Sequence, residues 1–236
     1  MRRYLIVDDN REFAENLAEI VRDHGAEVDL AVGGAEAVAL VKRTRYHALL
    51  TDMRMPGMGG ALVVHEVRRI DPGLPALVVT AYVADDALEA ARREGLLAVL
   101  AKPVPLPALI ELLGSARRDG LVAVIEDDQR LSDNLCEALR GRGFAAATAA
   151  SVLETERLGA LQPFCGLADL RVPGGPDGEA LRRLGEQFPG LPVLVMSGIH
   201  TGPPPGPAPF FRKPFDTAEL LAAVERLHAS RPGSRR

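Results

Sequence analysis

Cysteine and basic charge are both scarce in this sequence, and each scarcity argues against a class of protein. Two cysteines, Cys136 and Cys165, occur in 236 residues. Two are too few for a disulfide framework or a cysteine-based metal site in a chain of this size, so both are expected to be small core residues in a reducing compartment. The net charge is -4, and each half of the sequence carries two more acids than bases. Because nucleic-acid-reading domains usually present a basic surplus on one face, no nucleic-acid partner is expected.

Long hydrophobic runs are missing as well. The chain begins with Met1-Arg2-Arg3 and then a strand-like run that is too short for the apolar core of a signal peptide. No stretch approaches the roughly 20 apolar residues that a membrane span needs. We therefore expect a cytoplasmic protein with no membrane partner. The composition, 47% hydrophobic and 25% charged residues, is typical of a folded globular protein.

The second half of the sequence repeats the first. Four blocks recur in the same order: 4–17 as 122–135, 48–58 as 165–175, 77–81 as 193–198, and 100–104 as 211–215. The interval of about 118 residues is far longer than the period of a solenoid, so it indicates a duplicated domain. We predict one domain over 1–118, a second over 119–230, and a disordered basic tail over 231–236.

Each copy alternates short apolar runs with amphipathic stretches. In the first copy the expected strands are 4–8, 27–31, 48–52, 76–80 and 97–101. Stretch 105–113 is apolar and helix-prone. Apolar strands that alternate with helices indicate a parallel sheet covered on both faces. The predicted fold is α/β, with two five-stranded, doubly wound domains in tandem.

Reactive side chains stand where the strands of the first copy end. Ligands of an open parallel sheet collect beyond the carboxyl ends of its strands. Those ends carry Asp8, Asp9, Asp52, Thr80 and Lys102. Three carboxylates that repel one another need a cation or a proton among them, and oxygen ligands without His or Cys favour Mg²⁺. Asp52 can then attack a phosphoryl group while Mg²⁺ and Lys102 neutralise its oxygens and Thr80 donates a hydrogen bond.

The second copy repeats this set with small changes. Its residues are Glu126, Asp127, Asp169, Ser197 and Lys213. A single aspartate at a strand end is usually a helix cap, and Lys-Pro is usually a turn. Two sets at matched spacing are not expected from caps and turns alone.

Together these residues resemble the response-regulator receiver domain, the flavodoxin-like module that histidine kinases phosphorylate. The resemblance covers both copies. It implies that Asp52 is the phosphoacceptor and that Thr80 and Lys102 contact the phosphoryl group. It also implies that Asp9, Asp52 and the main-chain carbonyl of Arg54 bind Mg²⁺ directly, that Asp8 helps through water, and that the peptide bond after Lys102 is cis.

For the second copy the resemblance implies Asp169 as acceptor, with Ser197 and Lys213 on the phosphoryl group. The implied metal ligands are Glu126, Asp127, Asp169 and the carbonyl of Arg171. The implied partners are a histidine kinase or phosphotransfer protein and a downstream protein. Receivers often dimerise through their fourth and fifth helices, which favours a homodimer through the first copy, where both are retained.

The copies depart from the family in two places. Thr80 and Lys102 are 22 residues apart, but Ser197 and Lys213 are 16 apart, and the shortened stretch holds prolines 203, 204, 205, 207 and 209. Because proline breaks helices, a stiff loop over 202–209 should replace the fourth helix of the second copy. It is interpreted as a spacer rather than as a ligand for an SH3-like partner.

The aromatic residue that the family places three positions before its lysine is also altered. The first copy has Val99 there, and the second has Phe210. The aromatic switch of the family is therefore in doubt for the first copy. We hypothesise that Tyr82 shields a phosphorylated Asp52 from water.

The sequence favours a phosphorylation-driven regulator that signals through protein–protein interaction. The alternative is a non-catalytic adaptor or phosphate sink whose second copy is a silent pseudo-receiver. A turnover enzyme is disfavoured because neither a Walker loop nor GxGxxG follows the first strand, and the two copies leave no room for a helix-turn-helix. Self-phosphotransfer and autodephosphorylation at aspartate are expected, with no independent turnover.

Overall fold

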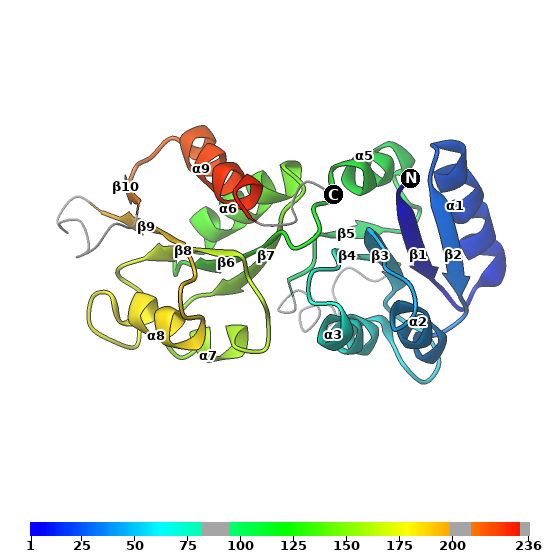
Figure 1. Ribbon diagram of the computed structural model, residues 1–236, viewed down its shortest axis with the longest axis horizontal. Coiled ribbons are helices and arrows are strands. Elements are labelled where there is room, and N and C mark those ends of the chain that lie inside the picture. Colours follow the sequence, from blue (N-terminus) through cyan, green and yellow to red (C-terminus); the bar gives the residue numbers. More distant parts are fainter. Residues whose placement is uncertain (82–94, 199–208, 232–236) are drawn as a thin grey trace. The chain divides into compact units, whose positions relative to one another are not determined.

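The computed structural model describes residues 1–81, 95–198 and 209–231. The chain divides into two compact units, Met1–Arg118 and Asp119–Arg236. Each unit contains one five-stranded sheet in which every pair of neighbouring strands is parallel, and helices alternate with the strands along the chain (Figure 1). The prediction of two five-stranded parallel sheets with alternating helices is confirmed.

The first sheet has the strand order β2-β1-β3-β4-β5. Its strands are β1 (Arg3–Val7), β2 (Glu27–Ala31), β3 (Ala48–Asp52), β4 (Ala76–Thr80) and β5 (Ala98–Ala101). The described helices of this unit are α1 (Arg11–Asp23), α2 (Gly34–Val41), α3 (Gly60–Ile70) and α5 (Leu106–Ser115). In Figure 1, α1 and α5 lie on one face of the sheet, and α2 and α3 lie on the other.

The second sheet has the order β10-β9-β8-β6-β7. Its strands are β6 (Leu121–Ile125), β7 (Ala145–Ala149), β8 (Cys165–Asp169), β9 (Val193–Ser197) and β10 (Phe210–Arg212). Its helices among the described residues are α6 (Gln129–Gly141), α7 (Thr155–Leu158), α8 (Glu179–Gln187) and α9 (Thr217–Ala229). Numbered within its own unit, each sheet has the order 2-1-3-4-5 of flavodoxin-like folds.

The strands are apolar because both faces of each sheet are covered. In β3 and β8 every residue is buried, and Leu49 of β3 and Leu167 of β8 belong to the core clusters of their units. Leu49, Val63 and Val78 pack together in the first core, and Leu167, Leu194 and Leu220 pack together in the second. Burial of one such side chain contributes roughly 1.5–3 kcal/mol.

Both cysteines are free thiols. Cys165 is buried in the second core, and Cys136 is partly buried on α6. Burial raises the pKa of both thiols, that of Cys136 to about 11. At neutral pH both are therefore protonated and behave as small apolar side chains.

Some expected features lie outside the described residues. They are Tyr82, most of the stretch 202–209, the tail beyond Arg231, and the fourth helix of the first unit, on which a dimer through that unit depends. Among the helices that are described, none has the length and apolar character needed to span a membrane.

Candidate functional site

Two acids and a lysine meet at the carboxyl end of the first sheet. Asp8 follows β1, Asp52 is the last residue of β3, and Lys102 follows β5. The Lys102 Nζ lies 2.8 Å from Asp8 Oδ2 and 2.7 Å from Asp52 Oδ1. The topology explains this meeting, because parallel strands end at the same edge and β1 and β3 are neighbours.

The charges of these three groups are coupled. Asp8 and Asp52 are buried, so two carboxylates this close are tolerated only with a cation between them. Burial lowers the pKa of Lys102, but the hydrogen bonds to Asp52 and Asp8 outweigh this effect and raise it above its usual value. The ammonium therefore stays charged at neutral pH. The third expected acid, Asp9, has an exposed side chain.

Backbone groups orient both buried carboxylates. The N–H of Asn10 donates to Asp8 Oδ1 at 2.9 Å, and the N–H of Arg54 donates to Asp52 Oδ2 at 2.7 Å. Thr80 is buried at the end of β4, and its carbonyl accepts from the Lys102 N–H at 2.9 Å. This last bond links Thr80, at the end of β4, to Lys102.

Two features of this site are absent from the sequence-based prediction. The Lys102 ammonium lies over the ring of Phe13, 4.3 Å from its centroid. Gly60, the first residue of α3, lies so close to the main-chain carbonyl of Asp52 that a Cβ would clash with it. The cis peptide bond predicted after Lys102 is confirmed, and the Lys213-Pro214 bond is cis as well.

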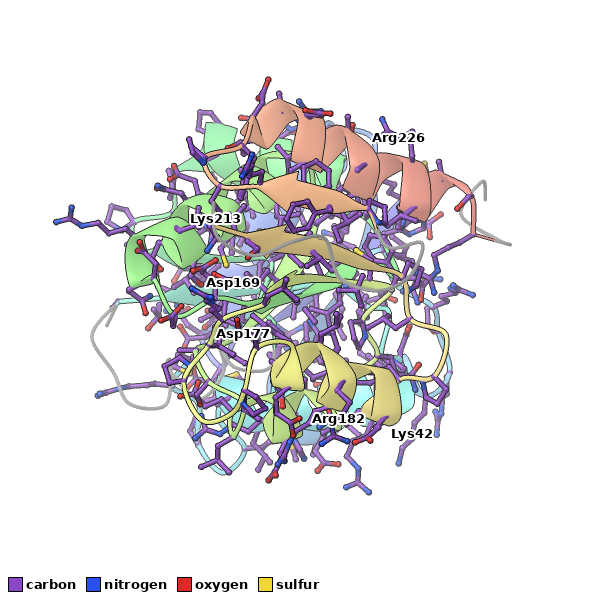
Figure 2. The ribbon with its side chains drawn as sticks, turned by 90° about the vertical axis from the view of Figure 1, so that its left-hand side faces the viewer. Lys42, Asp169, Asp177, Arg182, Lys213 and Arg226 are labelled. Atoms are coloured by element: carbon purple, nitrogen blue, oxygen red, sulfur yellow. The ribbon has the colours of Figure 1, made fainter. Side chains whose placement is uncertain are left out.

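The second unit repeats the arrangement. Lys213 Nζ lies 2.6 Å from Glu126 Oε2 and 2.5 Å from Asp169 Oδ2. In Figure 2 the side chains of Lys213 and Asp169 lie beside each other at the edge of the second sheet. Ser197 is buried at the end of β9, and its carbonyl accepts from the Lys213 N–H at 2.7 Å. The cluster of acids and lysine in the second unit thus has the same contacts as the cluster in the first unit.

The acids of the second unit form a group that could hold a metal ion. Among residues of the described ranges, Glu126, Asp127 and Asp169 are the group of three whose carboxylate oxygens all lie within 4.8 Å of one another. Burial raises the pKa of Glu126; the bond to Lys213 opposes this, and the nearby charge of Asp169 adds to it. An all-oxygen donor set with crowded negative charge fits Mg²⁺.

The other predicted site residues take places around these clusters. The Arg171 N–H donates to Asp169 Oδ1 at 3.0 Å, as that of Arg54 does to Asp52, and its guanidinium pairs with Asp177. Val99 and Phe210, the two residues at the aromatic-switch position, are both partly buried.

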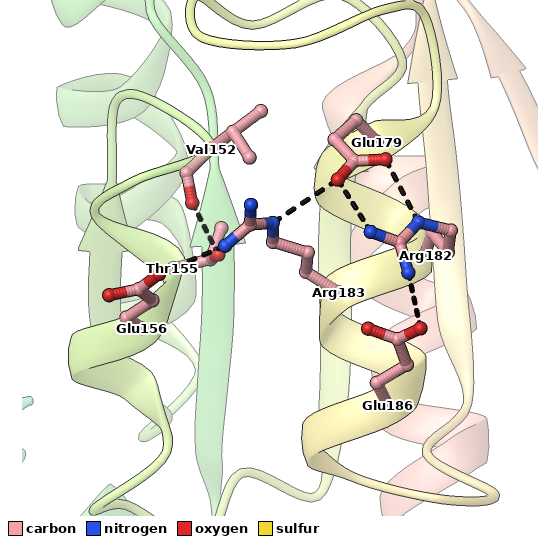
Figure 3. A network of polar contacts seen from close by, with 7 residues as sticks. All are labelled: Val152, Thr155, Glu156, Glu179, Arg182, Arg183 and Glu186. Carbon is pink, nitrogen blue, oxygen red and sulfur yellow. Dashed lines mark hydrogen bonds and ion pairs between the residues drawn. The ribbon is translucent and has the colours of Figure 1, made fainter.

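A second polar network in this unit ties α7 to α8 (Figure 3). The Arg183 guanidinium pairs with Glu156 at 2.9 Å and with Glu179 at 3.2 Å, and Arg182 pairs with Glu179 at 2.6 Å. These hydrogen bonds from Arg182 and Arg183 lower the pKa of Glu179 to about 2. None of these residues belongs to the strand-end cluster of acids and lysine, so the network is a structural tie between the two helices.

A hollow in the described part of the second unit is distinct from the acidic cluster. It is a groove of about 750 Å³ beside β10 and α9, and its walls include Leu194, Phe211, Phe215, Ala223 and Leu227. None of the three clustered acids lines it.

Comparison with known proteins connects this geometry to one family. The model of the response regulator receiver domain matches residues 4–114. A response regulator receiver protein of Anaeromyxobacter sp. (strain Fw109-5) is 73% identical over 231 residues, which cover 98% of this chain and 97% of that protein. A transcriptional regulatory protein of Salmonella typhimurium is 32% identical over 109 residues, or 46% of this chain and 25% of that protein.

One similar solved structure is also named a receiver domain. It is the receiver domain of a sensor histidine kinase of Pseudomonas aeruginosa PAO1, described with a magnesium ion coordinated in its active site cleft. It is 29% identical, covers 48% of this chain and 93% of its own, and has a TM-score of 0.45.

Proposed function

The chain belongs to the response regulator receiver family, and we propose that it takes up a phosphoryl group on Asp52 from a histidine kinase or phosphotransfer protein. The observation that carries this proposal is the bridge from Lys102 to Asp8 and Asp52. It brings a nucleophilic carboxylate, a fixed positive charge and a second acid to one edge of the sheet. This is the set of groups that phosphoryl transfer to a carboxylate requires.

In the proposed step a carboxylate oxygen of Asp52 attacks phosphorus. The bond from phosphorus to the donor imidazole nitrogen breaks, and its electron pair leaves with the imidazole, which is neutral if its other nitrogen carries the proton. The Lys102 ammonium, which already lies beside Asp52, exchanges its bonds to the carboxylates for bonds to the phosphoryl oxygens, and the Thr80 hydroxyl donates to one of these oxygens. Release follows when water attacks phosphorus: the bond from phosphorus to the Asp52 oxygen breaks, its electron pair restores the carboxylate, and inorganic phosphate departs with the oxygen of the water.

The oxygen ligands of the site support a resident divalent cation. Mg²⁺ would be held by Asp9, Asp52 and the carbonyl of Arg54, with Asp8 acting through water. Bound there, it supplies positive charge against the phosphoryl oxygens. Orientation of Asp52 by the Arg54 N–H leaves its other oxygen, Oδ1, toward Lys102.

We further propose that the second unit is a second receiver with Asp169 as acceptor. Ser197 and Lys213 would contact its phosphoryl group, and Glu126, Asp127, Asp169 and the carbonyl of Arg171 would hold its Mg²⁺. The shared strand order, the lysine bridge and the group of three acids support this assignment. Phosphorylation would alter the affinity of the protein for a downstream partner.

The test is phosphate uptake by the full chain from radiolabelled acetyl phosphate, with Mg²⁺ or with EDTA. Wild type, Asp52→Ala, Asp169→Ala and the double variant are compared. The proposal predicts Mg²⁺-dependent label that Asp52→Ala reduces and the double variant abolishes. Label in Asp169→Ala equal to wild type would make the second unit a silent pseudo-receiver. Label in none of the four would favour a non-catalytic adaptor.

A further inference from the structure

Lys102 has a third partner that carries no charge. Besides its two carboxylates, the ammonium lies 4.3 Å from the centroid of the Phe13 ring. Phe13 is partly buried in the first turn of α1, and the Lys102 side chain is 24% exposed. A cation within about 6 Å of an aromatic face is attracted by the ring quadrupole, and desolvation strengthens the attraction.

A helix cap links the backbone of Phe13 to the carboxylate of Asp8. Asn10 donates its N–H to Asp8 Oδ1 at 2.9 Å, and its side-chain oxygen accepts from the Phe13 N–H at 3.1 Å. The contacts therefore form a closed loop that runs from Asp8 through Asn10 and Phe13 to Lys102 and back to Asp8. Such a loop holds the ammonium in one place without depending on a single bond.

The second unit has the corresponding contacts, except that no aromatic ring lies at the place of Phe13. Asp128 caps α6 and accepts from the Leu131 N–H at 3.2 Å, while its own N–H donates to Glu126 at 3.3 Å. Lys213 bridges Glu126 and Asp169. The residue at the place of Phe13 is Leu131, which packs against the core of its unit. Leucine therefore fits this position of the fold and offers no π face.

We propose that Phe13 is a positioning residue for phosphoryl transfer to Asp52, whose ring keeps the Lys102 ammonium in place when the carboxylates turn to other partners. This inference rests on the proposed function of Asp52. The oxygens of Asp8 and Asp52 that now accept from Lys102 are the ones that a divalent cation and a phosphoryl group would claim. The ring competes for none of these oxygens, so its contact with the ammonium can persist through the reaction.

The test uses the full chain in an Asp169→Asn background, so that label reports on the first unit. Initial rates of uptake from radiolabelled acetyl phosphate are measured against donor concentration at saturating Mg²⁺, and Mg²⁺ affinity is measured separately by titration. Three residues are compared at position 13: the native Phe13, Phe13→Leu, which copies the second unit, and Phe13→Tyr, which keeps the aromatic face. Urea unfolding of each variant checks that the fold is retained.

The expected result is a kcat that falls about threefold to tenfold in Phe13→Leu, with KM and Mg²⁺ affinity unchanged within about twofold. Phe13→Tyr should stay within about twofold of the parent. A Phe13→Leu rate equal to the parent rate would overturn the inference, and so would a Phe13→Tyr rate as low as that of Phe13→Leu. Absence of label in the parent itself would overturn the proposed function together with the inference, and is thereby distinguishable from failure of the inference alone.

Discussion

The ammonium of Lys102 lies 2.7 Å from the carboxylate of Asp52, beside the oxygen that would carry the proposed phosphoryl group. The second unit has the same relationship between Lys213 and Asp169, at 2.5 Å. In both units the lysine thus neutralises buried acids in the resting protein. Under the proposed function the same charge would pair with phosphoryl oxygens during transfer, so stability and function would both depend on this lysine in each unit.

Replacement of Lys102 by methionine should destabilise the first unit. It removes the cation from two buried carboxylates and leaves them to repel each other. We expect the free energy of unfolding at pH 7 in metal-free buffer to fall by about 2 kcal/mol, below the full cost of breaking a buried pair because Lys102 is partly exposed. Mg²⁺ should recover part of this loss, since it replaces the missing positive charge.

Urea unfolding with EDTA and with Mg²⁺ measures both effects. The matched control is Lys42→Met, because Lys42 is an exposed lysine and its loss should change stability by less than about 0.5 kcal/mol. Equal stability of Lys102→Met and Lys42→Met would contradict the account of the paired acids.

Alkaline pH should destabilise the first unit through Tyr46. Burial, and then the hydrogen bond from its hydroxyl to Asp29 at 2.7 Å, raise the pKa of Tyr46 from 10.0 to about 12. Between these values the folded state holds the proton that the unfolded chain has lost, so stability falls as pH rises, by about 3 kcal/mol in total. Below pH 10 this contribution is fully present.

The Tyr46→Phe variant isolates the contribution. At pH 8 it should be less stable than wild type by about 1 kcal/mol, because Asp29 loses a donor but keeps Arg3. Since Phe cannot ionise, the gap should close or reverse toward pH 12. Urea midpoints measured across this range check the prediction, and parallel curves for the two proteins would show that Tyr46 does not titrate as described.

Alanine at Gly60 should disturb the phosphoacceptor strand. A Cβ there would collide with the main-chain carbonyl of Asp52, and backbone cannot move aside as a flexible side chain can. We expect a loss of about 2 kcal/mol in stability and slower phosphate uptake at Asp52, because the N-terminus of α3 must shift away from β3.

Gly114→Ala is the control for this substitution. Gly114 lies in α5 with open space where its Cβ would stand, so alanine should leave stability unchanged or raise it by up to about 1 kcal/mol. Thermal unfolding of both variants compares them directly. A Gly60→Ala protein as stable as Gly114→Ala would mean that α3 is free to adjust.

Much of this fold could be predicted from the sequence because its signals are local. Short runs rich in Val, Leu and Ile located β2, β3 and β4 without error, and β1 and β5 within one residue. Strand topology then places the residues after β1, β3 and β5 at one edge. The meeting of Asp8, Asp52 and Lys102 follows from that topology and needs no further knowledge of side chains.

Contacts that depend on the rotation of a helix could not be predicted in this way. Phe13 recurs at helical spacing with apolar neighbours and is indistinguishable by pattern from an ordinary core residue. The three-dimensional structure shows that Asn10 caps the Phe13 N–H and that the ring of Phe13 lies against the Lys102 ammonium. The close approach of Gly60 to Asp52 is similarly hidden, because a glycine at the start of a helix has several common explanations.

The most direct test of the account is to locate the phosphate on the wild-type chain. The protein is incubated with Mg²⁺ and acetyl phosphate, acyl phosphates are reduced with borohydride, and the modified residue is identified by peptide mass mapping. The account predicts modification at Asp52 that disappears in Asp52→Asn and without Mg²⁺. Phosphate uptake that persists unchanged in Asp52→Asn, with Asp52 unmodified in wild type, would contradict it.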